Sequence, residues 1–146
     1  MTPQDAVADA VRRLRGIAYD TEKLAQIAQD GVLGVALDEW ETPDDIERTR
    51  KALCRGYVAH ALRDAWDLSD EPKPFLRMLV GPYKRGQWHA MLELKIGDER
   101  TWADVQKGEI SPPEWFSAFS PQYAYQWGPI PGGMGFGRRW KLTEQT

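Results

Sequence analysis

The sequence of 146 residues contains one cysteine, Cys54, and two histidines, His60 and His89. A single cysteine cannot form a disulfide within the chain, which favours a reducing compartment, and we expect a cytoplasmic protein. Zinc sites need cysteines or histidines at characteristic spacings, and these spacings are absent from the sequence. We therefore expect no metal ligands, and the three residues stand out as candidates for other chemistry.

The sequence also lacks long hydrophobic runs. No segment approaches the roughly 18 consecutive apolar residues of a membrane-spanning helix, and Met1–Asp5 has neither the basic start nor the apolar core of a signal peptide. Gly132 to Gly137 is dense in glycine, but it follows no strand–helix unit and carries no Gly-Lys-Ser/Thr. We expect no membrane association and no nucleotide or other cofactor.

Charge is divided between the two halves of the chain. Residues 1–72 carry a net charge of −6 and residues 73–146 a net charge of +3. So small a positive excess is not expected to bind nucleic acid. The length suits a single domain over residues 1–146, with a helical half (1–72) and a half that combines a sheet with an aromatic tail (73–146).

Helix signals dominate the first half. Thr2-Pro3 followed by Asp5 is typical of a helix start, and apolar residues then recur at helical spacing as far as Leu14. A second helix is expected between Asp20 and Gly31. Thr42-Pro43-Asp44-Asp45 predicts a third helix, running from about Pro43 to Trp66. That helix would hold Cys54 in its interior, where the dipole gives a thiolate no support, and would include Gly56 as a weak interior position.

The second half predicts an antiparallel meander. Phe75–Val80 and Trp88–Ile96 have strand character, a turn is expected over Gly81–Gly86, and Thr101–Gln106 follows as a third strand. The even-numbered residues of Trp88–Ile96 are apolar and are expected to face the core, which leaves His89 on a more polar face. The sequence thus predicts an α+β fold, in which N-terminal helices pack on an antiparallel sheet of three or more strands.

The segment after Lys107 is rich in glycine, proline and aromatic residues and shows no clear period. A short helix is expected to start at Ser111-Pro112. The aromatic residues are predicted to cover the sheet; they are Trp115, Phe116, Phe119 and Trp127. Alternatively, this tail forms a binding surface, to which Arg138 and Arg139 would add charge.

Cys54, His89 and Asp104 form a candidate catalytic set. A histidine near a cysteine stabilises the thiolate, and a carboxylate orients the imidazole. His89 and Asp104 fall on neighbouring predicted strands, where side chains on adjacent strands can touch.

Three short motifs contain these residues: Cys54-Arg55-Gly56-Tyr57-Val58, His89-Ala90-Met91-Leu92-Glu93 and Trp102-Ala103-Asp104. In this order they resemble the nucleophile region, the His-Ala-aromatic-x-Glu motif and the acid motif of transglutaminase-like proteins, within the papain-like superfamily. The separations of 35 and 15 residues suit that family, and the resemblance covers about residues 50–106. It implies that Cys54 attacks an amide or peptide carbonyl to form a thioester, with His89 as base and acid and Asp104 as orienting acid. Trp88 and Trp102 are then candidate substrate-binding residues.

Other interpretations remain open. Cys54 could be a buried hydrophobic residue, and the chain a non-catalytic protein-binding or adaptor domain that uses its aromatic tail. Glu93-Leu94-Lys95 matches the Glu-x-Lys of restriction-type nucleases, although no aspartate occurs between Phe75 and Gln87. His60 is expected on the polar side of its helix. In either main interpretation the partner is a protein or peptide; the oligomeric state does not follow from the sequence.

Overall fold

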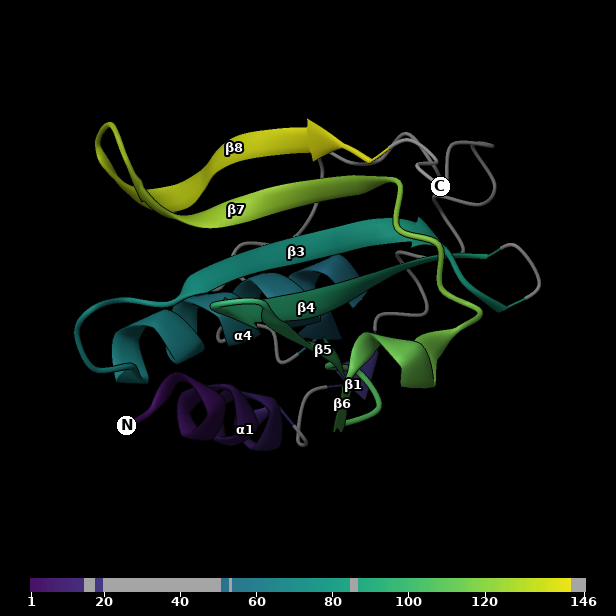
Figure 1. Cartoon of the computed structure of the whole chain (residues 1–146), viewed down its shortest axis with the longest axis horizontal. Helices are drawn as coiled ribbons and strands as arrows, with labels where there is room; N and C mark the ends of the chain where they lie inside the picture. Colours follow the sequence, from purple (N-terminus) through teal and green to yellow (C-terminus); the bar gives the residue numbers. More distant parts are fainter. Residues whose placement is uncertain (15–17, 20–50, 53, 85–86, 143–146) are drawn as a thin grey trace.

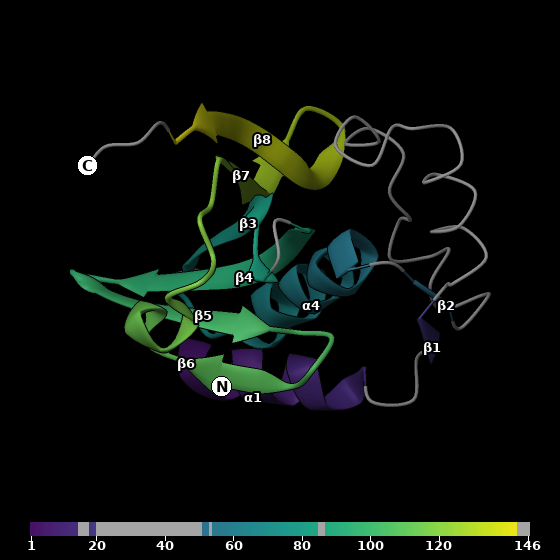
Figure 2. The same ribbon diagram turned by 90° about the vertical axis from the view of Figure 1, so that its right-hand side faces the viewer.

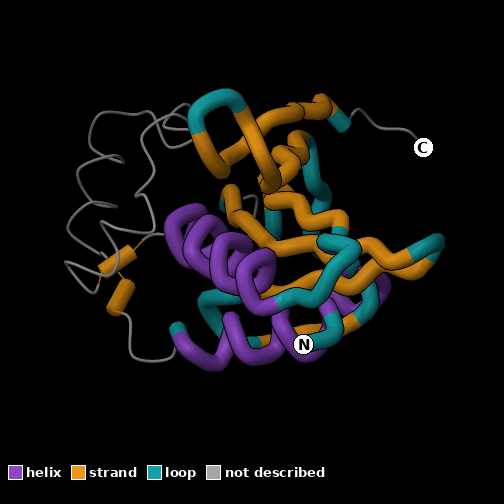
Figure 3. The backbone as a smooth tube through the Cα atoms, turned by 90° about the vertical axis from the view of Figure 1, so that its left-hand side faces the viewer, coloured by secondary structure: helices purple, strands orange, loops and turns teal. Residues whose placement is uncertain are grey.

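A six-stranded antiparallel sheet forms the centre of the molecule, with strand order β6-β5-β4-β3-β7-β8. The computed structural model describes residues 1–14, 18–19, 51–52, 54–84 and 87–142. Two helices, α1 (Pro3–Arg13) and α4 (Cys54–Leu68), lie side by side on one face of the sheet (Figure 1, Figure 3). The strands are β3 (Phe75–Pro82), β4 (Trp88–Ile96), β5 (Glu99–Asp104), β6 (Glu109–Ser111), β7 (Tyr123–Ile130) and β8 (Gly133–Lys141). The predicted α+β architecture is confirmed.

Helix α1 forms where the sequence predicts it. The Thr2 side chain accepts a hydrogen bond from the backbone N–H of Asp5 (3.2 Å), and Pro3 occupies the first turn. Asp9 accepts hydrogen bonds from Arg12 and Arg13, which stabilises the outer face of the helix. Its inner face is buried through Ala6, Val7, Ala10 and Val11. Among the described residues, neither helix has the length and apolar character that crossing a membrane requires.

Helix α4 begins at Cys54, not near Pro43. Lys51–Ala52 form a short strand, β2, that pairs in parallel with β1 (Ala18–Tyr19), so the chain is extended just before the cysteine. The prediction of one continuous helix from Pro43 to Trp66 is therefore wrong, because Lys51–Ala52 form a strand, and Gly56 lies in the first turn of α4. The helix beginning at Thr42-Pro43 and the one expected between Asp20 and Gly31 lie outside the described residues.

The central strands of the sheet are buried on both faces. The main core contains residues of α1, α4 and the even-numbered positions of β4: Val7, Ala10, Val58, Leu62, Ala90, Leu92 and Leu94 are among them. The opposite face carries a second core, in which Met91 packs with Leu79, Phe116, Phe119 and Ala124. Ala90, Leu92 and Leu94 face the core as predicted, whereas Trp88 and Ile96 at the ends of the strand are exposed. The odd-numbered face is less exposed than expected, because Met91 and Glu93 are fully buried.

The strands β3, β4 and β5 form the predicted meander. β4 has the predicted bounds, and β5 begins two residues earlier than expected. β3 extends through Gly81 and Pro82, which the sequence placed in a turn; Gly81 pairs with His89 and Pro82 with Trp88.

The tail after Lys107 is part of the sheet. β7 and β8 form a hairpin around Gly132, whose φ of 91° is a conformation that glycine adopts readily. The 3-10 helix η3 (Pro113–Phe116) covers the face of the sheet opposite α4 (Figure 2). Phe116 and Phe119 are buried as predicted, but Trp115 is 76% exposed, contrary to the prediction that it covers the sheet. Trp127 is a residue of β7, and its side chain is buried in the main core.

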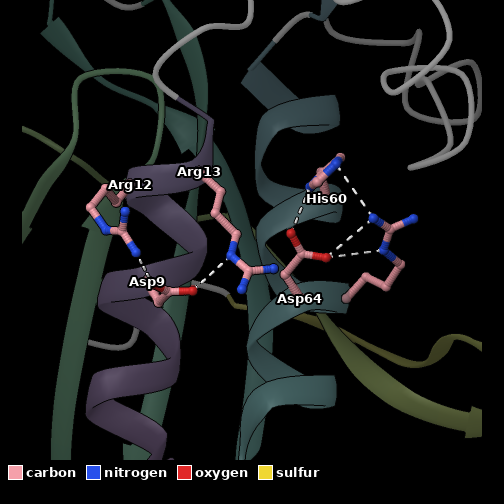
Figure 4. A network of polar contacts seen from close by, with 6 residues as sticks. Asp9, Arg12, Arg13, His60 and Asp64 are labelled. Atoms are coloured by element: carbon pink, nitrogen blue, oxygen red, sulfur yellow. Dashed lines mark hydrogen bonds and ion pairs between the residues drawn. The ribbon is translucent and has the colours of Figure 1, made fainter.

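A polar cluster on α4 corrects the expectation for His60, which is buried rather than on a polar surface. Its Nδ1 lies 3.3 Å from Asp64 Oδ2, and Arg63 donates to Asp64 Oδ1 at 3.2 Å (Figure 4). Burial raises the pKa of Asp64, but the hydrogen bond from His60 and the positive charges of His60 and Arg63 outweigh it, so the pKa is lowered overall.

This lowered pKa predicts an acid-dependent contribution of Asp64 to stability. The contribution is fully present above the unfolded-state pKa of about 3.9 and is lost as the pH falls through the lower folded-state pKa. We expect Asp64→Asn to lower the unfolding free energy by about 1 kcal/mol at neutral pH. The difference between variant and wild type should shrink below about pH 4. Thermal unfolding of both proteins across this range measures it; a gap that stays constant down to the lowest pH would contradict the assignment.

Candidate functional site

His89 and Asp104 meet at one end of the sheet. His89 is the second residue of β4, and Asp104 ends β5, one residue after Ala103, which pairs with Leu92. The two side chains therefore lie on the same face, diagonally across adjacent strands. His89 Nε2 is 3.1 Å from Asp104 Oδ1. Asp104 is fully buried and the His89 side chain is 14% exposed. The predicted juxtaposition of these two residues is present. Nδ1 is the ring nitrogen that does not face Asp104.

Tyr83 packs against the imidazole and was not found by sequence reasoning. The ring centroids of Tyr83 and His89 are 5.4 Å apart, with the planes inclined by 24°, and the edge of Phe119 supports Tyr83 from the other side. Burial and the negative charge of Asp104 raise the pKa of the Tyr83 hydroxyl, and Lys107 partly offsets this. The histidine is thus held in orientation by its contact with Asp104 and by the stacked Tyr83 ring.

Gly81 faces His89 across the strand pair and lies against another backbone segment. The amide of Ser120 donates to Pro82 O (2.9 Å) and that of Gln122 donates to Val80 O (2.8 Å), which draws this segment onto β3. A Cβ atom at Gly81 would lie 2.2 Å from Ser120 O, well inside van der Waals contact. Glycine is therefore required at this position by the approach of the backbone.

We expect Gly81→Ala to lower the unfolding free energy by about 2–3 kcal/mol, because the clash is with backbone that cannot rotate away. Urea unfolding followed by circular dichroism measures the loss. Gly97→Ala is an informative comparison: Gly97 has φ 58°, and a Cβ atom there would meet no other atom within 4 Å, so its cost is only conformational. A smaller loss at Gly81 than at Gly97 would contradict the proposed clash.

A cavity of about 290 Å³ opens beside this pair of residues. Besides His89 and Asp104, its lining consists of Tyr83, Lys84, Gln87, Trp88, Gln106 and Lys107. Trp88 is 40% exposed and stacks on Tyr123 at 6.3 Å. The candidate substrate-binding residue Trp88 therefore forms part of the cavity wall.

Trp102, the other candidate for substrate binding, does not line this cavity. Its indole N–H donates to Glu93 Oε2 (3.0 Å), while Arg77 Nε donates to Glu93 Oε1 (2.7 Å). Glu93 is fully buried and lies between these two partners, an arrangement that links three strands. No group of three potential metal ligands occurs among the described residues. The nuclease interpretation of Glu93 and Lys95 therefore receives no support.

Cys54 is the first residue of α4, where the helix dipole favours a negative charge. α4 ends at Leu68, shortly before β3 starts, and lies along the sheet (Figure 1). The 15-residue helix and the eight-residue strand have similar lengths, about 22 and 26 Å. The first residue of α4 is thus directed toward the end of the sheet where β3 ends and β4 begins. The Cys54 side chain lies outside the described part of the chain.

No protein-family model and no curated protein matches this sequence. Three solved structures of Legionella pneumophila LapG have a similar fold. The first has a TM-score of 0.66 at 11% identity and covers 84% of this chain and 65% of LapG. The EGTA-treated form has a TM-score of 0.66 at 14% identity, and the match covers 91% of this chain and 71% of LapG. The calcium-bound form has a TM-score of 0.65 at 12% identity, and the match covers 98% of this chain and 74% of LapG. The chain spans about two thirds of the length of LapG and shares its fold.

Proposed function

We propose that the chain is a transglutaminase-like cysteine acyltransferase or hydrolase that acts on an amide or peptide bond. The observation that carries this proposal is the contact between His89 and buried Asp104 beside a cavity, at the end of the sheet toward which α4 directs Cys54. LapG, whose fold the chain shares, is a transglutaminase-like cysteine protease, and this likeness supports the same class of chemistry. The substrate would be a protein or peptide, because such a chain supplies an amide carbonyl that can reach a cavity at the molecular surface.

The geometry suggests how the residues divide the work. α4 packs on the even-numbered face of β4 and His89 extends from the odd-numbered face, so the thiol and the imidazole would meet beyond the end of the sheet. Asp104 holds Nε2, so the proton exchanged with the thiol would be carried by Nδ1 of the same ring. The start of α4 also offers backbone N–H groups that have no acceptor within the helix, and these could stabilise an oxyanion.

The reaction proceeds in two stages. The thiolate sulfur of Cys54 attacks the carbonyl carbon, and the protonated imidazole donates its proton to the departing amine, which leaves as the carbon–nitrogen bond breaks. A thioester remains. In the second stage, His89 takes a proton from water or from an acceptor amine, whose oxygen or nitrogen attacks the thioester. The carbon–sulfur bond breaks, the thiolate of Cys54 and the protonated imidazole are restored, and an acid or a new amide is released.

A mixed library of peptides tests the proposal directly. We expect wild-type protein to produce new peptide ends, or amine-modified peptides when an alkylamine is added, and we expect Cys54→Ser to produce neither. Mass spectrometry identifies the products and their sequence preference. Wild-type protein that leaves the whole library unchanged in both formats, with Cys54 inert to alkylating reagents, would rule out the proposed chemistry.

A non-catalytic binding domain is the second candidate. The observation in its favour is Trp115, which is 76% exposed next to the buried Phe116 of η3. A large exposed indole is common at protein–protein contacts. This function predicts an inert Cys54 and a partner whose binding is lost on Trp115→Ala, whereas the catalytic function predicts that Trp115→Ala leaves peptide turnover intact.

A further inference from the structure

We propose that the cavity beside His89 is a subsite for an acidic side chain of the peptide substrate, close to the bond that reacts. This inference rests on the proposed function and adds a substrate preference to it. Among the residues that line the cavity, Lys84 and Lys107 are the charged side chains exposed to solvent. Asp104 is the remaining charge, and it is fully buried and paired with His89. The accessible charge of the lining is therefore positive.

Both lysines contact residues of the site. The turn that carries Lys107 follows β5, and its amide donates to the backbone oxygen of Asp104 (3.2 Å). The Lys84 ammonium lies 5.2 Å from the centre of the Tyr83 ring, which in turn stacks on His89. Two cations therefore approach the site from the β3–β4 connection and from the turn after β5. Glu109, which is exposed and pairs with Asp104 across β5 and β6, is not part of the lining.

The rest of the lining suits a peptide segment. Gln87 and Gln106 carry amides that can both donate to and accept from a peptide backbone, and Trp88 offers an exposed ring for an apolar contact. The volume of about 290 Å³ lies at the lower end of the range of ligand pockets. It leaves space for one side chain and adjoining backbone rather than for a large ligand.

A carboxylate is the anion that the side chains of an unmodified peptide supply, and a lysine ammonium pairs with it as a point charge. The described lining contains lysine and no arginine. The exposed positions of both lysines imply a modest, salt-sensitive preference instead of an absolute requirement.

Two pairs of peptidyl chloromethyl ketones test this inference. The members of each pair differ only in glutamate against glutamine, placed next to the ketone-bearing residue in one pair and one residue further away in the other. The Cys54 thiolate displaces chloride, so a carbon–sulfur bond forms as the carbon–chlorine bond breaks. We expect the glutamate reagent of at least one pair to label Cys54 about five times faster at low ionic strength. At about 0.5 M salt the preference should largely disappear.

Charge-matched variants give the control. Lys84→Gln combined with Lys107→Gln should abolish the glutamate preference, so that each glutamate reagent labels Cys54 at the rate of its glutamine partner. Lys95→Gln combined with Arg100→Gln removes the same charge from a residue pair at the far end of β4 and β5 and should keep the preference. Equal rates for glutamate and glutamine, or a preference that survives in Lys84→Gln/Lys107→Gln, would overturn the subsite while Cys54-dependent labelling upholds the catalytic proposal. Failure of all four reagents to label Cys54 overturns both.

Discussion

Replacing His89 with alanine is expected to lower turnover of a peptide substrate by about 10²–10⁴-fold, the usual contribution of a general acid–base. In the proposed mechanism this imidazole takes the proton of the thiol and returns one to the leaving amine, and Asp104 holds it at 3.1 Å for both steps. Because the loss is in the chemical step, it should appear in kcat more than in KM. Steady-state kinetics on a peptide selected from the library measures both constants.

Two further variants make the result specific. Asp104→Asn keeps the size of the side chain but removes the charge that stabilises the imidazolium, so a large loss in kcat is expected there too. His60→Ala removes the other histidine, which pairs with Asp64 on α4, and should leave kcat within a few-fold of wild type. Turnover by His89→Ala equal to that of His60→Ala would exclude His89 as the acid–base, provided that both variants have native circular dichroism spectra.

Replacing Glu93 with alanine is expected to lower the unfolding free energy by about 3–5 kcal/mol. Glu93 is fully buried, accepts from Arg77 at 2.7 Å and from Trp102 at 3.0 Å, and thereby connects β3, β4 and β5. Alanine would leave the guanidinium of Arg77, itself only 11% exposed, without its carboxylate. The Phe75 and Trp140 rings that flank Arg77 cannot replace that charge. Urea unfolding measures the loss.

Glu99 provides the matched control for Glu93. It is an exposed glutamate at the start of the neighbouring strand β5. Glu99→Ala therefore removes the same carboxylate from a solvent-exposed position and is expected to lower the unfolding free energy by less than about 0.5 kcal/mol. Similar unfolding free energies for the Glu93 and Glu99 variants would show that the buried network contributes little. The Glu93 result also bears on the site, since the three strands that it joins carry Gly81, His89 and Asp104.

The contact between His89 and Asp104 could be predicted from sequence because it depends on local order. Two consecutive strands joined by a short turn pair in an antiparallel way, and alternation puts the histidine and the aspartate on one face. Tyr83 could not be found in this way. Its ring reaches His89 only because β3 continues through Gly81 and Pro82, which in isolation are typical of a turn.

The start of α4 shows why local patterns fail elsewhere. The residues before Cys54 have ordinary helix propensity, yet Lys51–Ala52 pair with Ala18–Tyr19, more than 30 positions away in the sequence. A pairing between such distant segments leaves no trace in helical periodicity. The sequence does not predict the hairpin of β7 and β8, because its glycines and prolines are untypical of strands. The alternation of Tyr123, Tyr125 and Trp127 is recognised as a strand pattern only from the pairing of these residues with β8.

The most direct test of the proposed site is the pH dependence of Cys54 alkylation by iodoacetamide in the native protein. An ordinary thiol, with a pKa of about 8.5, reacts slowly at neutral pH. If His89 and the start of α4 stabilise the thiolate, the rate will reach its plateau at clearly lower pH, and His89→Ala will move the profile back toward that of an ordinary thiol. A thiol that reacts only after unfolding, or a profile that His89→Ala leaves unchanged, would contradict a catalytic pairing of Cys54 with His89.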